Sequence, residues 1–257
     1  MKTIQCLQGS SLWLANRCGM ITASRVAEIL PLMDRTLKDG TVKEGGFPAS
    51  RSGYLWELVT ERITHDTADH YVSPWMERGT QLEDDARLAY GMVNGVLVEQ
   101  VGLVVHPTMD FYRASPDGVV LPGGLELKVP KPETHLRWKD ARVVPKEHEP
   151  QCMAQIDCCE FDWVDFTSYL PNRCKEPECL SYIQFGEVVC QMCGTLLEKP
   201  IPEDLQLFTV RLYRDEKRIE FIRSHVRRLN DEVEEALMRL KGISVVTEQL
   251  KASLEVV

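Results

Sequence analysis

The sequence predicts an α/β (α+β) fold in which a central sheet is flanked by helices. Helical spacing of apolar residues dominates the first third of the chain and its last part, and β-rich segments dominate the middle. The resulting order of helix, helix, sheet, helix, strand and helix is typical of a sheet covered by helices. A chain of 257 residues can bury one large core, so we expect a single domain over residues 1–257.

The composition narrows the class of protein. The hydrophobic fraction of 44% and the charged fraction of 27% are those of an ordinary globular protein. The sequence contains no apolar run near the roughly 18 residues of a membrane span and no signal-peptide core at its start, so we expect an intracellular protein. A formal net charge of -9 argues against a generally basic protein that coats nucleic acid, although it is compatible with a local basic channel.

Three helices are predicted in the first part of the chain. In residues 21–33 the apolar residues share one helical face until Pro31 ends the helix. Residues 34–53 are rich in charge and glycine and predict a loop. Helical spacing resumes over residues 54–63 and again over residues 76–95.

Strands dominate the middle of the chain. Residues 96–106, 111–121 and 124–130 are β-rich, and "PGG" between the last two suits a tight reversal. We therefore expect the last two segments to pair as a hairpin.

The remaining chain alternates between the two element types. Residues 149–161 predict a helix, and residues 163–171 and 205–215 predict strands. Cysteines, prolines and glycines dominate residues 172–202, which indicates an insertion within the domain. A single apolar stripe over residues 219–240 predicts a long amphipathic helix.

Two acids and a lysine stand in the predicted hairpin, in "RASPDGVVLPGGLELKVP". Residues two apart on a strand project to the same face, so Glu126 and Lys128 point together while the intervening apolar residues face the core. If the two segments pair, Asp117 lies beside Glu126 at the end of the sheet.

This constellation has two interpretations. Two carboxylates and a backbone carbonyl are the hard oxygen ligands of Mg²⁺ or Mn²⁺. Lys128 would then position or deprotonate a water molecule, or stabilise charge on a phosphate oxygen. Alternatively, Glu126 and Lys128 form a structural ion pair, and Asp117 belongs to an ordinary Pro-Asp-Gly turn.

Further motifs favour the first interpretation. The pattern D–x8–E–x–K resembles the core of the PD-(D/E)xK nuclease superfamily. "WLANRCGMITAS", "RGTQLEDDARLAY" and "EPQCMAQID" resemble motifs of one branch, the phage lambda exonuclease and YqaJ-type viral recombinase family. The motifs occur in that family's order and cover most of residues 10–170. The resemblance implies a nuclease core with a central mixed sheet.

The resemblance also implies roles for individual residues. Asp117, Glu126 and the backbone carbonyl of Leu127 match the metal ligands, and Lys128 matches the catalytic lysine. Glu83 matches a helix acid that helps to hold the metal.

A second set matches residues that contact DNA in the family. The residues matching its pocket for the 5′-terminal phosphate are Arg17, Ser24, Ser115 and Gln155. Met76 matches an apolar wedge that separates the terminal base pair, and Arg35 and Lys38 are candidate strand contacts. The plainer alternatives are a helix cap for Ser24, a turn for Ser115, a surface partner for Arg17 and a core position for Met76.

The resemblance implies a Mg²⁺-dependent 5′→3′ exonuclease. Such an enzyme degrades one strand of linear double-stranded DNA from a 5′-phosphorylated end and leaves 3′ single-stranded tails for phage-type recombination. It also implies a homotrimer, a single-strand annealing protein as partner, and a phage or prophage origin with action in the bacterial cytoplasm. The alternatives are a structure-specific or restriction-type endonuclease and a non-catalytic module that binds DNA ends.

The insertion contains a separate metal-binding pattern. Its cysteines follow C–x4–C–x10–C–x2–C, and "CQMCG" has the form of a zinc knuckle. The four residues are Cys174, Cys179, Cys190 and Cys193. Four thiolates would hold structural Zn²⁺ and stabilise a segment too small to have its own core. Unligated thiols and an iron–sulfur cluster are the alternatives.

Overall fold

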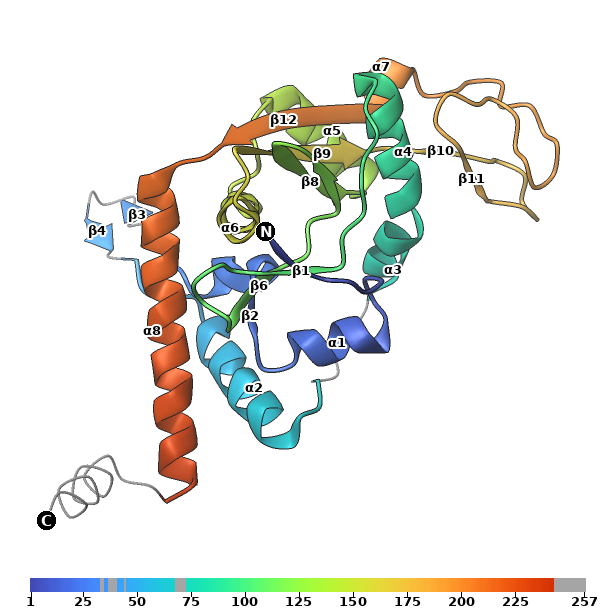
Figure 1. Cartoon of the computed structure of the whole chain (residues 1–257). Coiled ribbons are helices and arrows are strands. Elements are labelled where there is room, and N and C mark those ends of the chain that lie inside the picture. Colours follow the sequence, from blue (N-terminus) through green and yellow to red (C-terminus); the bar gives the residue numbers. More distant parts are fainter. Residues whose placement is uncertain (33–34, 37–40, 44, 68–72, 243–257) are drawn as a thin grey trace, which may run out of the picture.

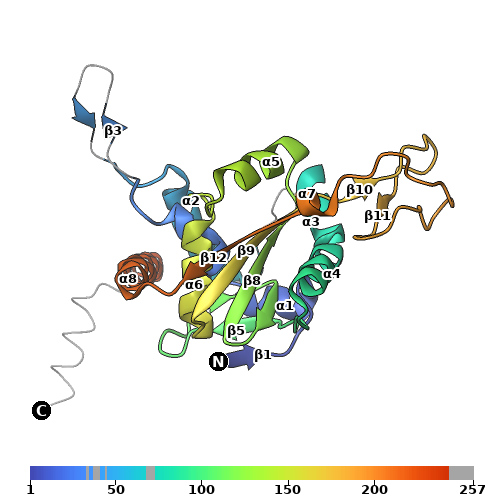
Figure 2. The same ribbon diagram turned by 90° about the horizontal axis from the view of Figure 1, so that it is seen from above.

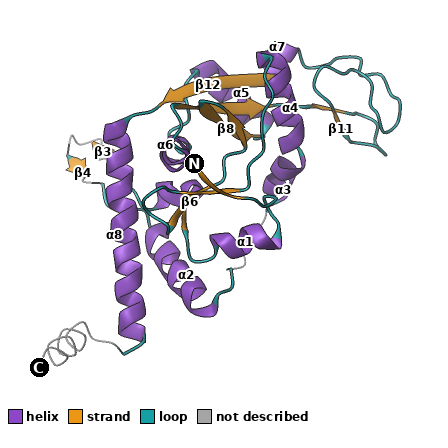
Figure 3. Cartoon of the chain, in the orientation of Figure 1, coloured by secondary structure: helices purple, strands orange, loops and turns teal. Residues whose placement is uncertain are grey.

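The computed structural model describes residues 1–32, 35–36, 41–43, 45–67 and 73–242. It confirms the predicted mixed class, because mixed sheets are flanked by helices (Figures 1 and 3). No helix in this part of the chain is long and apolar enough to cross a membrane.

One four-stranded sheet has, in spatial order, the strands β12 (Leu207–Tyr213), β9 (Trp163–Tyr169), β8 (Gly123–Lys128) and β7 (Gly118–Val120). β8 runs parallel to β9, with Glu126 opposite Phe166. β7 and β12 run antiparallel to their neighbours. The predicted hairpin is therefore present, and it pairs β7 with the first half of β8.

A second four-stranded sheet has, in spatial order, the strands β1 (Lys2–Ile4), β5 (Leu103–Val105), β6 (Tyr112–Ala114) and β2 (Ile21–Thr22). β2 runs parallel to β6, and the other pairs are antiparallel. The chain leaves this sheet after β6 and enters the first sheet at β7. The segment with Ser115 and Asp117 therefore lies at the junction of the two sheets.

Helices cover both faces of the sheet that contains β8. α4 (Glu83–Asn94) packs on one face, where its Ala86 and Tyr90 share a core with Leu125 and Leu127. α6 (Glu149–Cys159) packs on the other face, and α8 (Glu216–Leu240) lies outside α6 (Figure 2). Glu126 and Lys128 therefore face α6.

The remaining elements surround the two sheets. They are α1 (Ser11–Arg17), the 3₁₀ helix η1 (Ala23–Glu28), β3 (Arg35–Thr36), β4 (Val42–Lys43), α2 (Ser50–Thr64), α3 (Pro74–Gln81), α5 (Pro132–Ala141), β10 (Asn172–Arg173), β11 (Tyr182–Ile183) and α7 (Glu203–Gln206). The cysteine-rich segment with β10 and β11 extends away from the body of the protein, beyond α4 (Figure 1).

Several details differ from the expected elements. The helix predicted for residues 21–33 is a strand followed by the 3₁₀ helix η1, and α2 begins at residue 50, inside the predicted loop. The helix expected over residues 76–95 is two helices, because the backbone leaves the helical conformation at Leu82 (φ -104°, ψ 5°). α5 was not predicted.

Candidate active site and metal-binding residues

Asp117 and β8 are joined by two hydrogen bonds across the hairpin. The backbone amide of Asp117 donates to the carbonyl of Leu125 at 3.0 Å, and the amide of Leu127 donates to Asp117 Oδ2 at 2.6 Å. The amide and carbonyl of one residue in an extended strand point to the same side. The carbonyl of Leu127 therefore faces the side on which Asp117 lies.

Glu126 and Lys128 form the second half of the site. The Glu126 side chain is buried, and its two oxygens have different donors. Lys128 Nζ donates to Oε1, and Gln155 Nε2 donates to Oε2 at 2.5 Å. α6 thus holds the carboxylate from one side and the strand lysine holds it from the other.

Glu83 lies at the start of α4, where Arg87 ties it to the hairpin. Arg87 Nη2 donates to Glu83 Oε1 at 2.5 Å, and its Nε donates to the backbone carbonyl of Asp117 at 2.7 Å. Asp84, on the exposed side, also pairs with Arg87. Sequence reasoning assigned no role to Arg87, although its spacing of four from Glu83 on a predicted helix is a recognisable pairing signal.

Two carboxylates of the site, Asp117 and Glu83, have raised pKa values. Burial and the charges of Glu126 and Glu83 raise the pKa of Asp117 well above its usual range, although Lys128 opposes the shift. Burial, together with Asp84 and Glu126, also raises the pKa of Glu83 despite its pairing with Arg87. Carboxylates that repel one another near a single lysine form an electrostatic environment that suits a divalent cation.

The three carboxylates do not converge on one point in this conformation. Among the described residues, the cysteine cluster is the one group of three or more metal-binding side chains whose ligand atoms all lie within 4.8 Å of one another. Glu83 is instead engaged by Arg87. Asp117, Glu126 and the Leu127 carbonyl nevertheless offer hard oxygen ligands of the kind that Mg²⁺ and Mn²⁺ prefer.

Three of the four predicted phosphate-pocket residues are connected through Trp13. Trp13 Nε1 donates to Ser115 Oγ at 2.9 Å, and the Arg17 guanidinium lies 4.1 Å from the centre of the Trp13 ring. Arg17 Nη2 also reaches Ser24 Oγ at 3.5 Å. In the described part of the chain Arg17 has no carboxylate ion-pair partner, so its charge is available to an anion. Trp13 belongs to the motif that carries the resemblance, but sequence reasoning gave it no role.

The fourth residue, Gln155, lies elsewhere in the site. Its side chain is buried and donates to Glu126, and its Oε1 has no hydrogen-bond partner among the described atoms. Met76 lies on α3 with 58% of its surface exposed. Arg35 lies in β3, opposite Lys43, and Lys38 is outside the described residues.

The four cysteines of the insertion form a compact cluster. Their sulfurs lie within 4.8 Å of one another, with 3.6 Å between Cys174 and Cys193 and between Cys179 and Cys190. These separations exceed the roughly 2.05 Å of a disulfide, so the thiols are free. A hydrogen bond with the Ser181 hydroxyl lowers the pKa of Cys190 to about 6, which favours the metal-binding thiolate.

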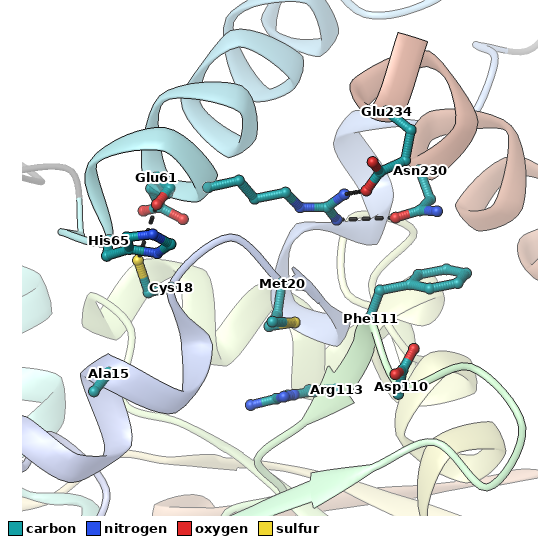
Figure 4. A pocket seen from close by; sticks show the side chains of 11 residues that line it. Ala15, Cys18, Met20, Glu61, His65, Asp110, Phe111, Arg113, Asn230 and Glu234 are labelled. Carbon is teal, nitrogen blue, oxygen red and sulfur yellow. Dashed lines mark hydrogen bonds and ion pairs between the residues drawn. The ribbon is translucent and has the colours of Figure 1, made fainter. Parts of the chain in front are cut away.

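A separate pocket of about 530 Å³ lies between α1, α2, β6 and α8 (Figure 4). Arg62 is one of the residues that line it, with Nη1 donating to Glu234 Oε1 at 2.6 Å and Nη2 donating to Asn230 Oδ1 at 2.9 Å. None of the predicted site residues is among those that line it.

Comparison with known proteins explains this arrangement. The model of the YqaJ-like viral recombinase domain matches residues 12–162, a span that contains the three carboxylates of the candidate active site and the four predicted phosphate-pocket residues. The chain belongs to the YqaJ-like viral recombinase family. The match contains the strands of both sheets except β1, β9 and β12, and the cysteine cluster lies outside it.

Solved structures similar to this YqaJ-family protein include an alkaline exonuclease, LHK-Exo, from Laribacter hongkongensis. It is 30% identical, with a TM-score of 0.68, and the match covers 90% of this chain and 96% of that one. LHK-Exo in complex with dAMP gives the same values. A phage-related exonuclease from Haemophilus somnus 129PT is 14% identical, with a TM-score of 0.57 and coverage of 86% and 96%, and shows the fold alone. No curated protein matches the chain.

Proposed function

We propose that this protein is a Mg²⁺-dependent 5′→3′ exonuclease that digests one strand of linear double-stranded DNA from a 5′-phosphorylated end. The observation that carries the proposal is the hydrogen-bonded assembly of Asp117, Glu126 and Lys128 on one hairpin. Similarity to LHK-Exo, which has also been solved in complex with dAMP, supports a nuclease that acts on DNA.

In the proposed site, Asp117, Glu126 and the Leu127 carbonyl hold the metal, with Glu83 as a further ligand. A bound Mg²⁺ or Mn²⁺ ion supplies a Lewis acid that activates water and neutralises negative charge on the phosphate. Lys128, as an ammonium group, stabilises charge that develops on a phosphate oxygen. Because Gln155 and Arg87 contact the carboxylates directly, we assign them to positioning.

The phosphate pocket gives the enzyme its preference for one end. A guanidinium can bind a terminal phosphate with two hydrogen bonds, and the hydroxyls of Ser24 and Ser115 can add further ones. Arg17 is held against the Trp13 ring and has no carboxylate to displace. Met76, exposed on α3, is the proposed wedge at the terminal base pair.

Digestion of matched linear and closed-circular duplexes tests the reaction class. We expect Mg²⁺-dependent loss of the linear DNA, no cutting of the circle, and no reaction in EDTA. Cutting of the circle would replace the exonuclease with an endonuclease. Tight binding of DNA ends, without digestion in the presence of either Mg²⁺ or Mn²⁺, would indicate a non-catalytic module.

We also propose that Cys174, Cys179, Cys190 and Cys193 bind one structural Zn²⁺ ion within the 172–202 insertion of a single 1–257 nuclease domain. Tetrahedral coordination with Zn–S bonds of about 2.3 Å spaces the sulfurs about 3.8 Å apart. The two separations of 3.6 Å are close to that value, and the cluster is too tight to enclose several iron ions. Metal analysis should find near-stoichiometric zinc in the parent and a large loss in Cys190→Ser. Iron, or no metal, in protein purified under reducing conditions would contradict the assignment.

Two further parts of the proposal rest on family resemblance. We propose that the protein acts as a homotrimer in phage-type recombination, beside a single-strand annealing protein. Light scattering after size-exclusion chromatography would measure the mass, and a monomer at working concentration would refute the trimer.

A further inference from the structure

Two aromatic rings and three cations are joined by ring–cation contacts between α3, the end of β8 and the cysteine insertion. We call this group the stacking face and define it as Trp75, Arg78, Lys131, Arg173 and Tyr182. Trp75 is 46% exposed, and its ring centre lies 5.2 Å from Lys131 Nζ and 5.4 Å from the Arg78 guanidinium carbon. The Tyr182 ring centre lies 4.9 Å from Arg78 and 5.7 Å from Arg173.

Arg78 fixes this face to the strand that contains the proposed active site. Its Nε donates to the Tyr182 hydroxyl at 2.7 Å, and its Nη1 donates to the carbonyls of Val129 at 3.0 Å and Pro130 at 3.3 Å. Those carbonyls directly follow Lys128. The cysteine-rich segment that projects from the body in Figure 1 is thereby linked to the end of β8 through the half-buried guanidinium group of Arg78.

The charge of the stacking face differs from that of the rest of the protein. The chain has a net charge of -9, and many of its arginines pair with carboxylates, as on α8. By contrast, Arg78, Lys131 and Arg173 have no carboxylate ion-pair partner among the described residues. Glu77 is on the same helix as Trp75, but residues two apart do not share a helix face. Cations are therefore concentrated around one exposed ring, Trp75, and one half-buried ring, Tyr182.

We infer that the stacking face binds a single strand of DNA, with a base stacked on Trp75 and the backbone phosphates held by Lys131 and Arg173. Aromatic rings accept any unpaired base, and neighbouring cations follow the phosphate backbone, which is how proteins bind single strands without sequence preference. A paired base inside a duplex cannot offer its face to Trp75. This inference rests on the proposed function, because Met76, next to Trp75, is the wedge that would part the strands.

The insertion supplies part of this surface. Tyr182 lies in β11, eight positions before Cys190, and Arg173 is adjacent to Cys174. The proposed zinc ion would therefore hold both residues in place against Arg78. The insertion thus has a role in substrate binding as well as in local stability.

The test is fluorescence anisotropy with a short labelled oligo(dT) in buffer without Mg²⁺, Mn²⁺ or a chelator, so that no hydrolysis occurs and the proposed zinc site stays loaded. Trp75→Ala and Trp75→Leu should each weaken binding by about tenfold, since a base stack contributes about 1–3 kcal/mol. Lys131→Ala should weaken binding and should also reduce the slope of log affinity against log salt concentration by about 0.7, the value for one phosphate contact on a single strand. Trp56→Ala is the matched control, because Trp56 on α2 is 49% exposed and lies outside the stacking face.

Circular dichroism and thermal midpoints confirm that each variant is folded. Parent-like oligo(dT) affinity in folded Trp75→Leu would overturn the inference, and so would an equal loss in Trp56→Ala. The two proposals can be refuted separately. If the parent digests duplex DNA but the Trp75 variants bind oligo(dT) as the parent does, only the inference about the stacking face is wrong. If oligo(dT) binding depends on Trp75 but the parent digests no DNA, only the proposed nuclease reaction is wrong.

Discussion

Replacement of Arg87 by lysine tests whether this residue positions the metal-binding carboxylates. Arg87 is 8% exposed and joins Glu83 Oε1, at 2.5 Å, to the Asp117 carbonyl, at 2.7 Å, while its third donor nitrogen pairs with the exposed Asp84. Lysine keeps the charge, but its single nitrogen on a flexible stem cannot reproduce the guanidinium fork. At least one hydrogen bond is lost, and a bond to a charged group contributes about 1.5–3 kcal/mol.

The expected result is a change in metal dependence. Substitution of residues that orient metal ligands typically lowers metal affinity by about 10–100-fold. We therefore expect the half-saturating Mg²⁺ concentration for digestion to rise by at least about tenfold in Arg87→Lys. The activity at saturating Mg²⁺ should fall less, because Lys128 and the Asp117–Glu126 pair remain.

Arg62→Lys is the matched control. Arg62 likewise donates to three acceptors, Glu234, Asn230 and the Gly19 carbonyl, but it lines the pocket in Figure 4 and contacts none of the carboxylates of the site. Both variants should lower the thermal midpoint, and only Arg87→Lys should shift the Mg²⁺ titration. An unchanged half-saturating concentration in Arg87→Lys would refute a positioning role.

Three further predictions concern stability. Asp157→Asn should lower the free energy of unfolding by about 3 kcal/mol in chemical denaturation, because it breaks a buried ion pair with Arg223 at 2.6 Å. Burial lowers the pKa of His135 below its usual 6.5 in the folded protein. The contribution of the neutral imidazole to stability is therefore complete above pH 6.5 and is lost as the pH falls from 6.5 through the lowered pKa. The pH dependence of unfolding should therefore be shallower in His135→Gln, and an identical profile would contradict this. Cys190→Ser should make the insertion sensitive to proteolysis while the thermal midpoint of the body changes little, whereas global unfolding would show that the insertion supports the whole fold.

Periodicity predicted the active-site strand well, for a physical reason. The alternation in "LELK" requires that Glu126 and Lys128 share a face, and the structure places them there, opposite the leucines that pack on α4. The hairpin that brings Asp117 beside them followed from the "PGG" reversal. These inferences depend on local geometry, which one sequence contains.

Helix details were harder to predict, because apolar spacing is compatible with more than one backbone. Val26 and Ile29 are three apart, which suits the turn of η1 as well as an α-helix. The apolar series continues through Leu82 and Ala86, so it gives no sign of the break between α3 and α4. His135 is the one residue of α5 that is buried, so the sequence of this helix has no apolar stripe from which it could be predicted.

Contacts between distant segments could not be read from the sequence. The hydrogen bonds from Arg87 to the Asp117 carbonyl and from Gln155 to Glu126 join residues that are about thirty positions apart. Gln155 was predicted at the phosphate pocket, and its contact with the Glu126 carboxylate was not foreseen. The stacking face likewise depends on the contact between Tyr182 and Arg78, which only the folded chain creates.

The most direct test of the central claim uses a linear duplex with one end blocked and a label on each strand. The other end carries either a 5′-phosphate or a 5′-hydroxyl. We predict that the parent with Mg²⁺ releases mononucleotides from the 5′ strand of the phosphorylated end, that the hydroxyl end reacts more slowly, and that Lys128→Ala is inactive on both. Loss of the 3′ strand first, equal rates at both ends, or parent-like digestion by Lys128→Ala would contradict the account.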